Sequence, residues 1–339
     1  MFKTLYIIGL SFFIVSCGTK RVVSTPKEST VKPIDTAKNP APEEKPEVKI
    51  IHKNNEDFFR TNIADISKND NTASFGSIVS AKLPKYEVVK TYFPAIAQNF
   101  RQRYIILHYT ALDHDKSITV LTQQSVSSHY LINDFDDDEI YQLVDENKRA
   151  YHAGVSAWRK DSQLNDTSIG IEIVNSGYVK DSLGQKIFPP YQDFQIKKVA
   201  ALVKNLIERY NVPATNILGH SDIAPTRKQD PGPQFPWKKL YDEYQIGMWY
   251  DETAKENFYN QTVNHDFTAL MQDATYIYKV QSDLKKFGYD VATSGTLDDA
   301  TKRTIEAFQF HFRPEKYDGI WDGETWAILQ VLIQKYPPK

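Results

Sequence analysis

The sequence predicts two folded domains: an α/β domain with a mixed central sheet flanked by helices, and a small all-α domain of three helices near the carboxyl end. Short runs of branched apolar residues, followed by one long amphipathic pattern, predict the first domain. Apolar stripes at helical spacing predict the second. The chain has 339 residues, which at about 150 per domain leaves room for both domains and an unpacked segment.

Composition and charge exclude several classes of protein. The net charge at pH 7 is −2, so the chain lacks the basic field that a nucleic-acid partner requires. Hydrophobic residues make up 41%, which excludes a fully disordered chain. The single cysteine rules out an intramolecular disulfide and a multi-thiolate metal site. Any metal must therefore be held by His, Asp or Glu.

Residues 1–16 are expected to be a lipoprotein signal peptide. The apolar run 5–15 has about 11 residues, fewer than the roughly 20 that span a bilayer. The run ends on IVSCG at 14–18, which resembles the lipobox of bacterial lipoproteins, so Cys17 is the expected lipidation site and membrane anchor. Gly18 favours the outer membrane of a Gram-negative cell, with the protein facing the periplasm. A plain secretory signal is the alternative.

Residues 17–49 are expected to form a disordered, Pro-rich tether after the lipidated cysteine. They are mostly Pro, Lys, Glu, Ser and Thr, with almost no large apolar side chain to offset the entropy of ordering. At about 3.1 Å per residue, such a tether reaches on the order of 100 Å, enough to carry a domain from a membrane toward a cell wall. Residues 50–85 form an extension that the sequence leaves unassigned.

The α/β domain is expected over residues 86–246. Branched apolar runs predict its strands, at 104–109, 129–132, 141–144 and 169–174. The acidic segment 133–139 lacks the glycine and spacing of a calcium loop, so it is interpreted as a solvated turn. Over 192–210 apolar residues recur at intervals of three and four, which predicts an amphipathic helix on the sheet.

Five of the eight histidines fall in this domain, at strand ends or in polar loops. His108 ends a predicted strand, and His220 ends the short apolar run 216–219. Asp230 follows in the loop 225–233, which is rich in proline and glycine and therefore rigid. Two imidazoles and one carboxylate with an open fourth position are what a catalytic zinc ion needs.

Several motifs, in this order along the chain, resemble the zinc-dependent N-acetylmuramoyl-L-alanine amidases of the type-2 amidase family, and most closely its lipid-anchored outer-membrane branch. They are HYTA at 108–111, SHYLI at 128–132, YHAG at 151–154, IGIEIVN at 169–175, and LGHSD at 218–222 followed by KQDPG at 228–232. The resemblance covers about half of the chain. It implies an amidase or peptidoglycan-recognition-like fold, and hydrolysis of the amide between N-acetylmuramic acid and L-alanine.

The resemblance assigns roles to five side chains. His108, His220 and Asp230 correspond to the zinc ligands, and Glu172 and Lys228 to the catalytic acid and lysine. Zinc lowers the pKa of a bound water to about 7 and polarises a carbonyl. Glu172 is expected to face the metal and to carry a proton from the water to the leaving amine. Lys228 is expected beside the developing oxyanion. The alternative role of Glu172 is a structural ion pair, and Lys228 could instead be an ordinary surface lysine.

The remaining polar residues receive weaker assignments. Tyr109 and His152 are expected to contact the substrate. His129 is expected to be a packing residue, and His114, between two aspartates, to be solvated. A non-haem iron site also uses two histidines and a carboxylate, but its first two ligands usually lie one residue apart, which does not fit the residues after His108.

Residues 247–275 are expected to be a polar, aromatic-containing connector, and 276–336 a three-helix domain. Its segments GY at 288–289 and DGIWDGETW at 318–326 resemble small peptidoglycan-binding domains. Helices are predicted from about 280, 297 and 323, with Thr296 and Asp299 spaced like a capping box. The apolar stripe of the middle helix is expected to be core. A packing module that has lost binding is the alternative.

The sequence as a whole therefore predicts a lipid-anchored, zinc-dependent amidase of the cell envelope. Its expected partners are peptidoglycan or muropeptides, and a membrane through Cys17; no protein partner is implied. One rival is a non-catalytic peptidoglycan-recognition protein on the same fold. Such proteins typically lack a metal ligand or the catalytic acid and lysine, whereas the three ligand positions and the two catalytic positions are all filled here. The lipobox and tether argue against a second rival, a phage-type lysin.

Overall fold

The computed structural model describes residues 84–85, 99–182, 184 and 186–338. The predicted signal peptide, the tether with Cys17 and nearly all of the extension 50–85 lie outside the described residues. Among those that are described, no helix combines the length and the apolar character needed to cross a bilayer.

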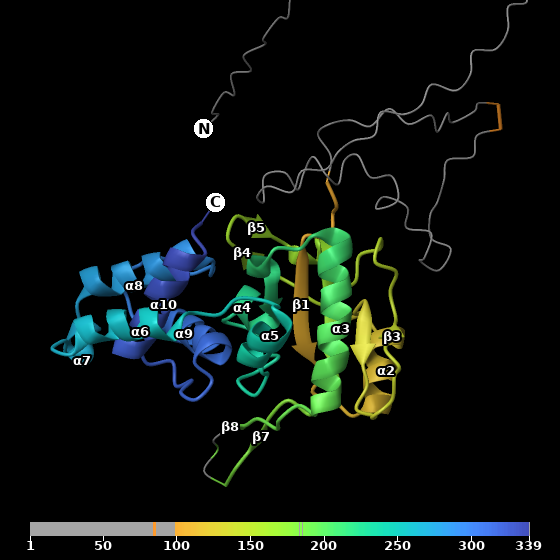
Figure 1. Cartoon of the computed structure of the whole chain (residues 1–339), viewed down its shortest axis with the longest axis horizontal. Coiled ribbons are helices and arrows are strands. Elements are labelled where there is room, and N and C mark those ends of the chain that lie inside the picture. Colours follow the sequence, from red (N-terminus) through yellow and green to blue (C-terminus); the bar gives the residue numbers. More distant parts are fainter. Residues whose placement is uncertain (1–83, 86–98, 183, 185, 339) are drawn as a thin grey trace, which may run out of the picture. The chain divides into compact units, whose positions relative to one another are not determined.

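A five-stranded sheet forms the centre of the first domain (Figure 1). Its strand order is β3-β2-β6-β1-β9, in which β2, β6, β1 and β9 run parallel and β3 is antiparallel at one edge. The bounds are β1 Tyr104–Tyr109, β2 Tyr130–Ile132, β3 Tyr141–Gln142, β6 Ser168–Ile173 and β9 Ile217–Gly219. The mixed sheet predicted from the apolar runs is confirmed.

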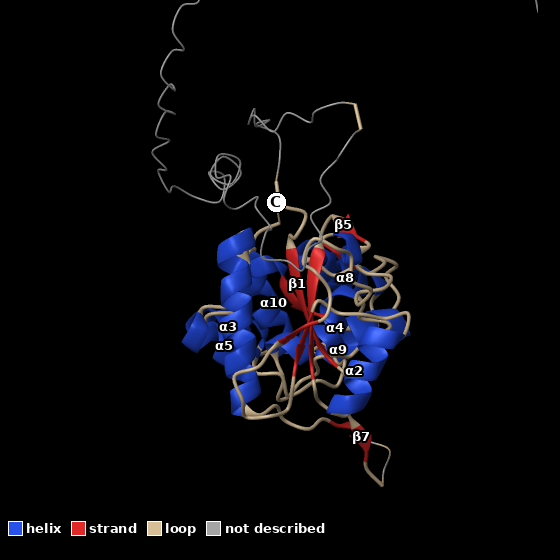
Figure 2. Cartoon of the chain, turned by 90° about the vertical axis from the view of Figure 1, so that its right-hand side faces the viewer, coloured by secondary structure: helices blue, strands red, loops and turns tan. Residues whose placement is uncertain are grey.

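Helices cover both faces of this sheet. Figure 2 shows the strands between α3 (Asp193–Tyr210) on one side and α2 (His114–Gln123) and α4 (His220–Ile223) on the other. The predicted amphipathic helix is α3, and its apolar stripe is buried in the core. A shorter helix, α5 (Trp237–Tyr244), follows. Two small hairpins, β4–β5 and β7–β8, were not predicted because two-residue strands leave no alternating pattern to detect. They comprise Ala157–Trp158 with Asp161–Ser162, and Val179–Lys180 with Lys186–Ile187.

The acidic turn between β2 and β3 is held by a lysine. Lys198 of α3 donates to the side chain of Asn133 at 2.7 Å and to the carbonyl of Phe135 at 2.9 Å, and it pairs with Asp137. An ammonium group thus lies among the oxygen atoms that a calcium ion would need, which agrees with the interpretation as a turn.

The predicted helices of the second domain are α8 (Ala274–Phe287), α9 (Asp299–Phe312) and α10 (Gly323–Lys335). The apolar stripe of α9 is buried, as expected. One detail was wrong: the N-cap of α9 is Asp298, whose side chain accepts from the backbone N–H of Thr301, and not Thr296.

Residues 247–275 are more than a connector. They contain α6 (Glu252–Tyr259) and α7 (Phe267–Leu270), and α6 packs against α10. The ring of Phe258 lies 5.8 Å from that of Trp326, and Trp249 is buried. The aromatic side chains of this segment thus pack against the C-terminal helices, Trp249 near Phe312 of α9 and Phe258 near Trp326 of α10.

The two predicted domains share one hydrophobic core. Buried residues from the sheet, α3 and all three C-terminal helices form a single cluster. Trp158 is fully buried within it: its Nε1 donates to the Thr215 carbonyl at 2.9 Å, and its ring lies 5.8 Å from Phe287 and 5.1 Å from Tyr289 of the helical domain. The helical domain is therefore packed on the α/β domain rather than suspended from it.

Because of this packing, we expect Trp158→Ala to lower the free energy of unfolding by about 3–5 kcal/mol, since it removes a large buried ring and leaves a cavity. Urea denaturation of purified protein measures the change. Val263→Ala, at a side chain that is 71% exposed, is the control and should change stability by less than about 0.5 kcal/mol. Equal effects of the two substitutions would contradict a shared core.

Candidate active site

Three neighbouring parallel strands bring the predicted site residues to one edge of the sheet. Glu172 of β6 pairs in register with His108 of β1. Leu107 pairs with Gly219, the last residue of β9, so His108 is the next residue on β1 and His220 is the first residue after β9, where α4 begins. Paired strands lie about 4.8 Å apart and paired residues point to the same face. The carboxyl ends of parallel strands are a common place for active sites.

The three predicted metal ligands converge at this edge. His108 Nδ1 lies 3.0 Å from His220 Nδ1 and 2.8 Å from Asp230 Oδ2, and His220 Nδ1 lies 3.0 Å from the same oxygen. All three side chains are buried. Residues far apart in the sequence thus present three ligand atoms to one point.

Backbone contacts place the loop that carries Asp230. The Ser221 N–H donates to the carbonyl of Asp230 at 2.8 Å, and the Tyr191 hydroxyl donates to the carbonyl of Pro231 at 2.7 Å. Gly219 allows the loop to approach, because a Cβ at this position would lie 2.7 Å from the Pro231 ring. The close passage of loop and strand holds the carboxylate beside the two imidazoles.

A chain of hydrogen bonds fixes the tautomer of His108. The Ser168 hydroxyl donates to the Leu164 carbonyl at 2.5 Å, so its oxygen accepts from His152 Nε2 at 3.1 Å. His152 Nδ1 then carries a lone pair and accepts from His108 Nε2 at 3.0 Å. Because the proton of neutral His108 is on Nε2, its Nδ1 presents a lone pair to the convergence point.

His220 is oriented in the same way by a carbonyl. Its Nε2 lies 3.1 Å from the oxygen of Ala153, an atom that can only accept, so this nitrogen carries the proton. Arg227 donates to the same oxygen at 2.8 Å and to the Val155 carbonyl at 2.9 Å. His220 Nδ1 therefore also presents a lone pair.

The electrostatics of the cluster fit a bound cation. Burial lowers the pKa of His108 to about 4, so its imidazole is neutral. Two lone pairs and a carboxylate oxygen thus face one another with no hydrogen between them. This arrangement repels itself unless a cation lies between the atoms, and two imidazoles with one carboxylate suit Zn²⁺.

Glu172 and Lys228 lie next to the cluster. One carboxylate oxygen of Glu172, Oε2, is buried and has no hydrogen-bond partner within the described part of the chain. Burial and the charge of Asp230 raise the pKa of Glu172 well above its ordinary value, while the charge of Lys228 opposes the rise. The charge of Lys228 also contributes to the lowered pKa of His108, after burial and the charge of His220.

His152 does not lie where the sequence predicted. It was expected to line a substrate groove, but it is buried behind His108, and both ring nitrogens are used within the protein. Its ring rests on Gly170, where a Cβ would come within 2.4 Å of it. The YHAG motif thus marks a residue that orients His108.

Of the predictions for the other two histidines of this domain, one is confirmed and one is wrong. His129 accepts from the Gly170 N–H and donates to the Lys148 carbonyl, both at 3.0 Å, so it is a packing residue as expected. His114 is not solvated: its ring packs 4.7 Å from Phe135 because helix α2 begins against the acidic turn.

Tyr109 ends β1 at the rim of the cluster. Its ring packs against the backbone of Gly177 and lies near Gly232, and burial, with the charge of Asp230, raises its pKa. Three supporting residues escaped sequence reasoning: Ser168, Tyr191 and Arg227. Each donates to a backbone carbonyl, an acceptor that every residue offers, so no residue pattern marks these contacts.

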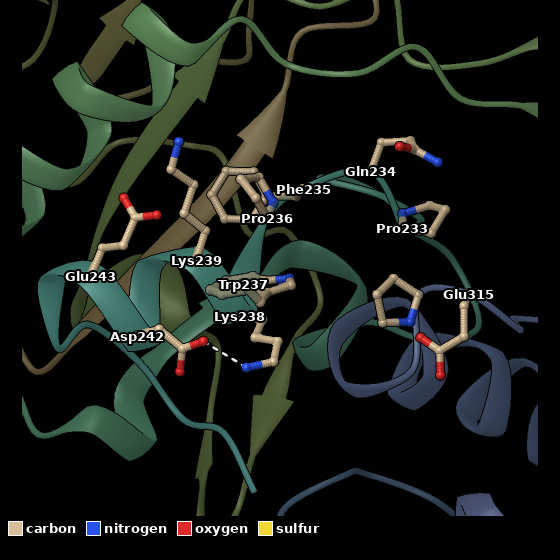
Figure 3. Close-up of a pocket in the computed structure, with 11 residues that line it drawn as sticks. Pro233, Gln234, Phe235, Pro236, Trp237, Lys238, Lys239, Asp242, Glu243 and Glu315 are labelled. Carbon is tan, nitrogen blue, oxygen red and sulfur yellow. Dashed lines mark hydrogen bonds and ion pairs between the residues drawn. The ribbon is translucent and has the colours of Figure 1, made fainter. Parts of the chain in front are cut away.

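A groove of about 620 Å³ lies just beyond the cluster, where the two domains meet (Figure 3). It is lined by residues 233–239, Asp242 and Glu243 of the α/β domain, and by Pro314 and Glu315 of the helical domain. Figure 3 shows the ring of Trp237 in its centre, next to the Lys238–Asp242 pair. None of the predicted site residues lines this groove, so it is separate from the ligand cluster.

Comparisons with known proteins agree with this architecture. Residues 98–233 match the family described as N-acetylmuramoyl-L-alanine amidase, and residues 275–329 match a putative peptidoglycan binding domain. The chain is 43% identical over 241 residues to the N-acetylmuramoyl-L-alanine amidase AmiD of Escherichia coli, covering 70% of this chain and 84% of that protein.

Two solved structures are similar over most of their length. One is E. coli AmiD with anhydro-N-acetylmuramic acid-L-Ala-D-γ-Glu-L-Lys, with a TM-score of 0.65, 40% identity, and coverage of 74% of this chain and 96% of that one. The other is AmpDH3 from Pseudomonas aeruginosa with anhydromuramic pentapeptide, with a TM-score of 0.62, 39% identity, and coverage of 77% and 100%. The chain therefore belongs to the N-acetylmuramoyl-L-alanine amidase family, as an enzyme whose C-terminal part matches a peptidoglycan-binding domain.

Proposed function

We propose that this protein is a zinc-dependent hydrolase that cuts the amide between N-acetylmuramic acid and L-alanine in peptidoglycan or in muropeptides. The observation that carries the proposal is the convergence of His108 Nδ1, His220 Nδ1 and Asp230 Oδ2, each turned inward as an acceptor, beside the partnerless oxygen of Glu172. A recognition protein that does not cut has no use for this buried carboxylate.

Each residue has a defined part in the reaction. Zinc, when bound, lowers the pKa of a water molecule and polarises a carbonyl. Glu172 has a raised pKa, which suits a carboxylate that takes a proton from water at Oε2 and returns it to the leaving amine nitrogen. Lys228, whose charge opposes the rise in the pKa of Glu172, is the residue that we assign to stabilise negative charge on the amide oxygen. His152 and Ser168 hold His108 in the tautomer that leaves Nδ1 free.

The related structures support a substrate that contains both muramic acid and a stem peptide, since both hold anhydromuramyl peptides. The match of the helical domain to a peptidoglycan-binding domain supports action on wall material as well. Tyr109, at the rim of the cluster, is the side chain that we assign to substrate contact.

His220→Ala should abolish zinc retention and turnover, because it removes one of the three proposed metal ligands. Metal analysis after dialysis should give about one zinc per wild-type chain and almost none in the variant. Release of new alanine amino termini from muropeptides measures turnover. A wild-type protein that binds muropeptides, holds zinc and releases no alanine amino terminus at neutral pH would favour the non-catalytic alternative.

Glu172→Gln should lower kcat by about 10²- to 10⁴-fold, because an amide cannot accept the proton, while zinc content stays at the wild-type level. Steady-state kinetics on a muropeptide, with metal analysis of the same sample, tests this. Glu139→Gln, at an exposed position of the acidic turn, is the matched control and should keep wild-type kcat. Wild-type kcat in zinc-loaded Glu172→Gln would remove Glu172 from the mechanism.

We also propose that the enzyme works in the cell envelope, attached by lipid on Cys17 to the outer membrane and facing the periplasm. Cys17→Ala should then abolish incorporation of labelled palmitate and move the protein from the membrane fraction to the soluble fraction. Activity of the variant on soluble muropeptides should be unchanged. Palmitate labelling that persists in Cys17→Ala would contradict this anchor.

A further inference from the structure

A buried carboxylate joins the metal-ligand segment to the helical domain. Asp222 lies on α4, two residues after His220, and is completely buried. Its Oδ2 accepts from the Gly219 N–H at 2.8 Å and contacts His311 Nδ1 at 2.7 Å, and its Oδ1 accepts from the Tyr289 hydroxyl at 2.6 Å. Two of these three partners come from the helical domain.

Both partners are held rigidly by residues of the α/β domain. His311 is 1% exposed, and its ring stacks on Trp237 at 3.9 Å with an interplanar angle of 13°. Tyr289 is also buried, with its ring 5.1 Å from Trp158. Neither ring can turn away without breaking this packing, so the two polar groups are aimed at Asp222.

The helical domain contacts the same segment at a second point. Arg303 of α9 donates to the carbonyl of Thr226 at 3.0 Å, two residues before Lys228. Segment 219–230 carries two of the three predicted ligands and the predicted catalytic lysine. The helical domain therefore holds this segment at Asp222 and at Thr226, on either side of its middle.

We propose that the helical domain positions the metal centre, with Tyr289 and His311 acting through Asp222 as positioning residues for His220. This inference rests on the proposed zinc site and adds a role for the domain beside wall binding. A buried carboxylate that loses a hydrogen-bond donor is strongly destabilised. Segment 219–223 would shift to recover a partner, and His220, which begins α4, would move with it. Loss of partners that orient metal ligands typically weakens metal binding about 10- to 100-fold.

The test is the zinc affinity of the full-length protein carrying Tyr289→Phe or His311→Phe. Both substitutions keep an aromatic ring and remove the polar contact with Asp222; Tyr289→Phe removes only the hydroxyl group, whereas His311→Phe also enlarges the ring. Competition with a chelator, at a temperature well below the Tm of every variant, should give zinc binding about 10-fold weaker than in the wild type. The absorption spectrum of the Co²⁺-substituted protein should shift in the same variants, because it reports the arrangement of the ligands.

Three further variants complete the design. Tyr276→Phe is the matched control: it is a half-buried tyrosine of α8 whose ring lies near Phe267, and it should keep wild-type affinity. His311→Asn can place an amide N–H where Nδ1 lay and should recover part of the affinity. Arg303→Ala, at an exposed side chain, tests the second contact if a core variant does not fold.

The outcomes separate this inference from the function on which it rests. Variants with a lowered Tm but with wild-type zinc affinity and an unchanged Co²⁺ spectrum would overturn the inference, since the contacts would then serve stability alone. A wild-type chain that binds no zinc would overturn the proposed function first. Weaker zinc binding in Tyr289→Phe and His311→Phe, with partial recovery in His311→Asn, supports the positioning role.

Discussion

The structure of the site depends on three electron-rich atoms being held about 3 Å apart in a buried place. Their mutual repulsion has to be opposed by the rest of the fold, because burial strengthens electrostatic interactions. Parallel pairing of β6, β1 and β9 provides the alignment, and hydrogen bonds that end on the carbonyls of Leu164 and Ala153 prevent either imidazole from turning a proton inward. A cation bound between the three atoms would offset this repulsion.

The sequence predicted the parts of this arrangement that depend on residue type and local pattern. Branched apolar runs located β1 and β6, and strand pairing then placed Glu172 beside His108. The parts that it did not predict depend on contacts across the fold. His152 was assigned to a groove because nothing local distinguishes a histidine that faces solvent from one that faces another histidine. Helix α6 was missed because the surface on which it packs is α10, more than 60 residues further along the chain.

Three buried carboxylates near the site show how surroundings select a role. Asp230 faces two imidazoles at 2.8 and 3.0 Å, which suits a permanent metal ligand. Glu172 has no hydrogen-bond donor on Oε2 among the described residues, and its pKa is raised, which suits a group that exchanges protons. Asp222 has donors on both oxygens and touches no ligand atom, which suits a structural link. The same functional group thus takes three roles because its neighbours differ.

The link through Asp222 bears on how a wall-binding domain can serve this enzyme. A domain on a flexible connector raises the local concentration of substrate and leaves its orientation free. Here Trp158 and Tyr289 are buried between the domains, and the backbone N–H of Arg159 donates to the Gly288 carbonyl at 2.8 Å. Separation of the domains would therefore expose a shared core and break polar contacts. The two domains therefore behave as one body, and any glycan held by the helical domain would meet the catalytic edge of the sheet in one fixed orientation.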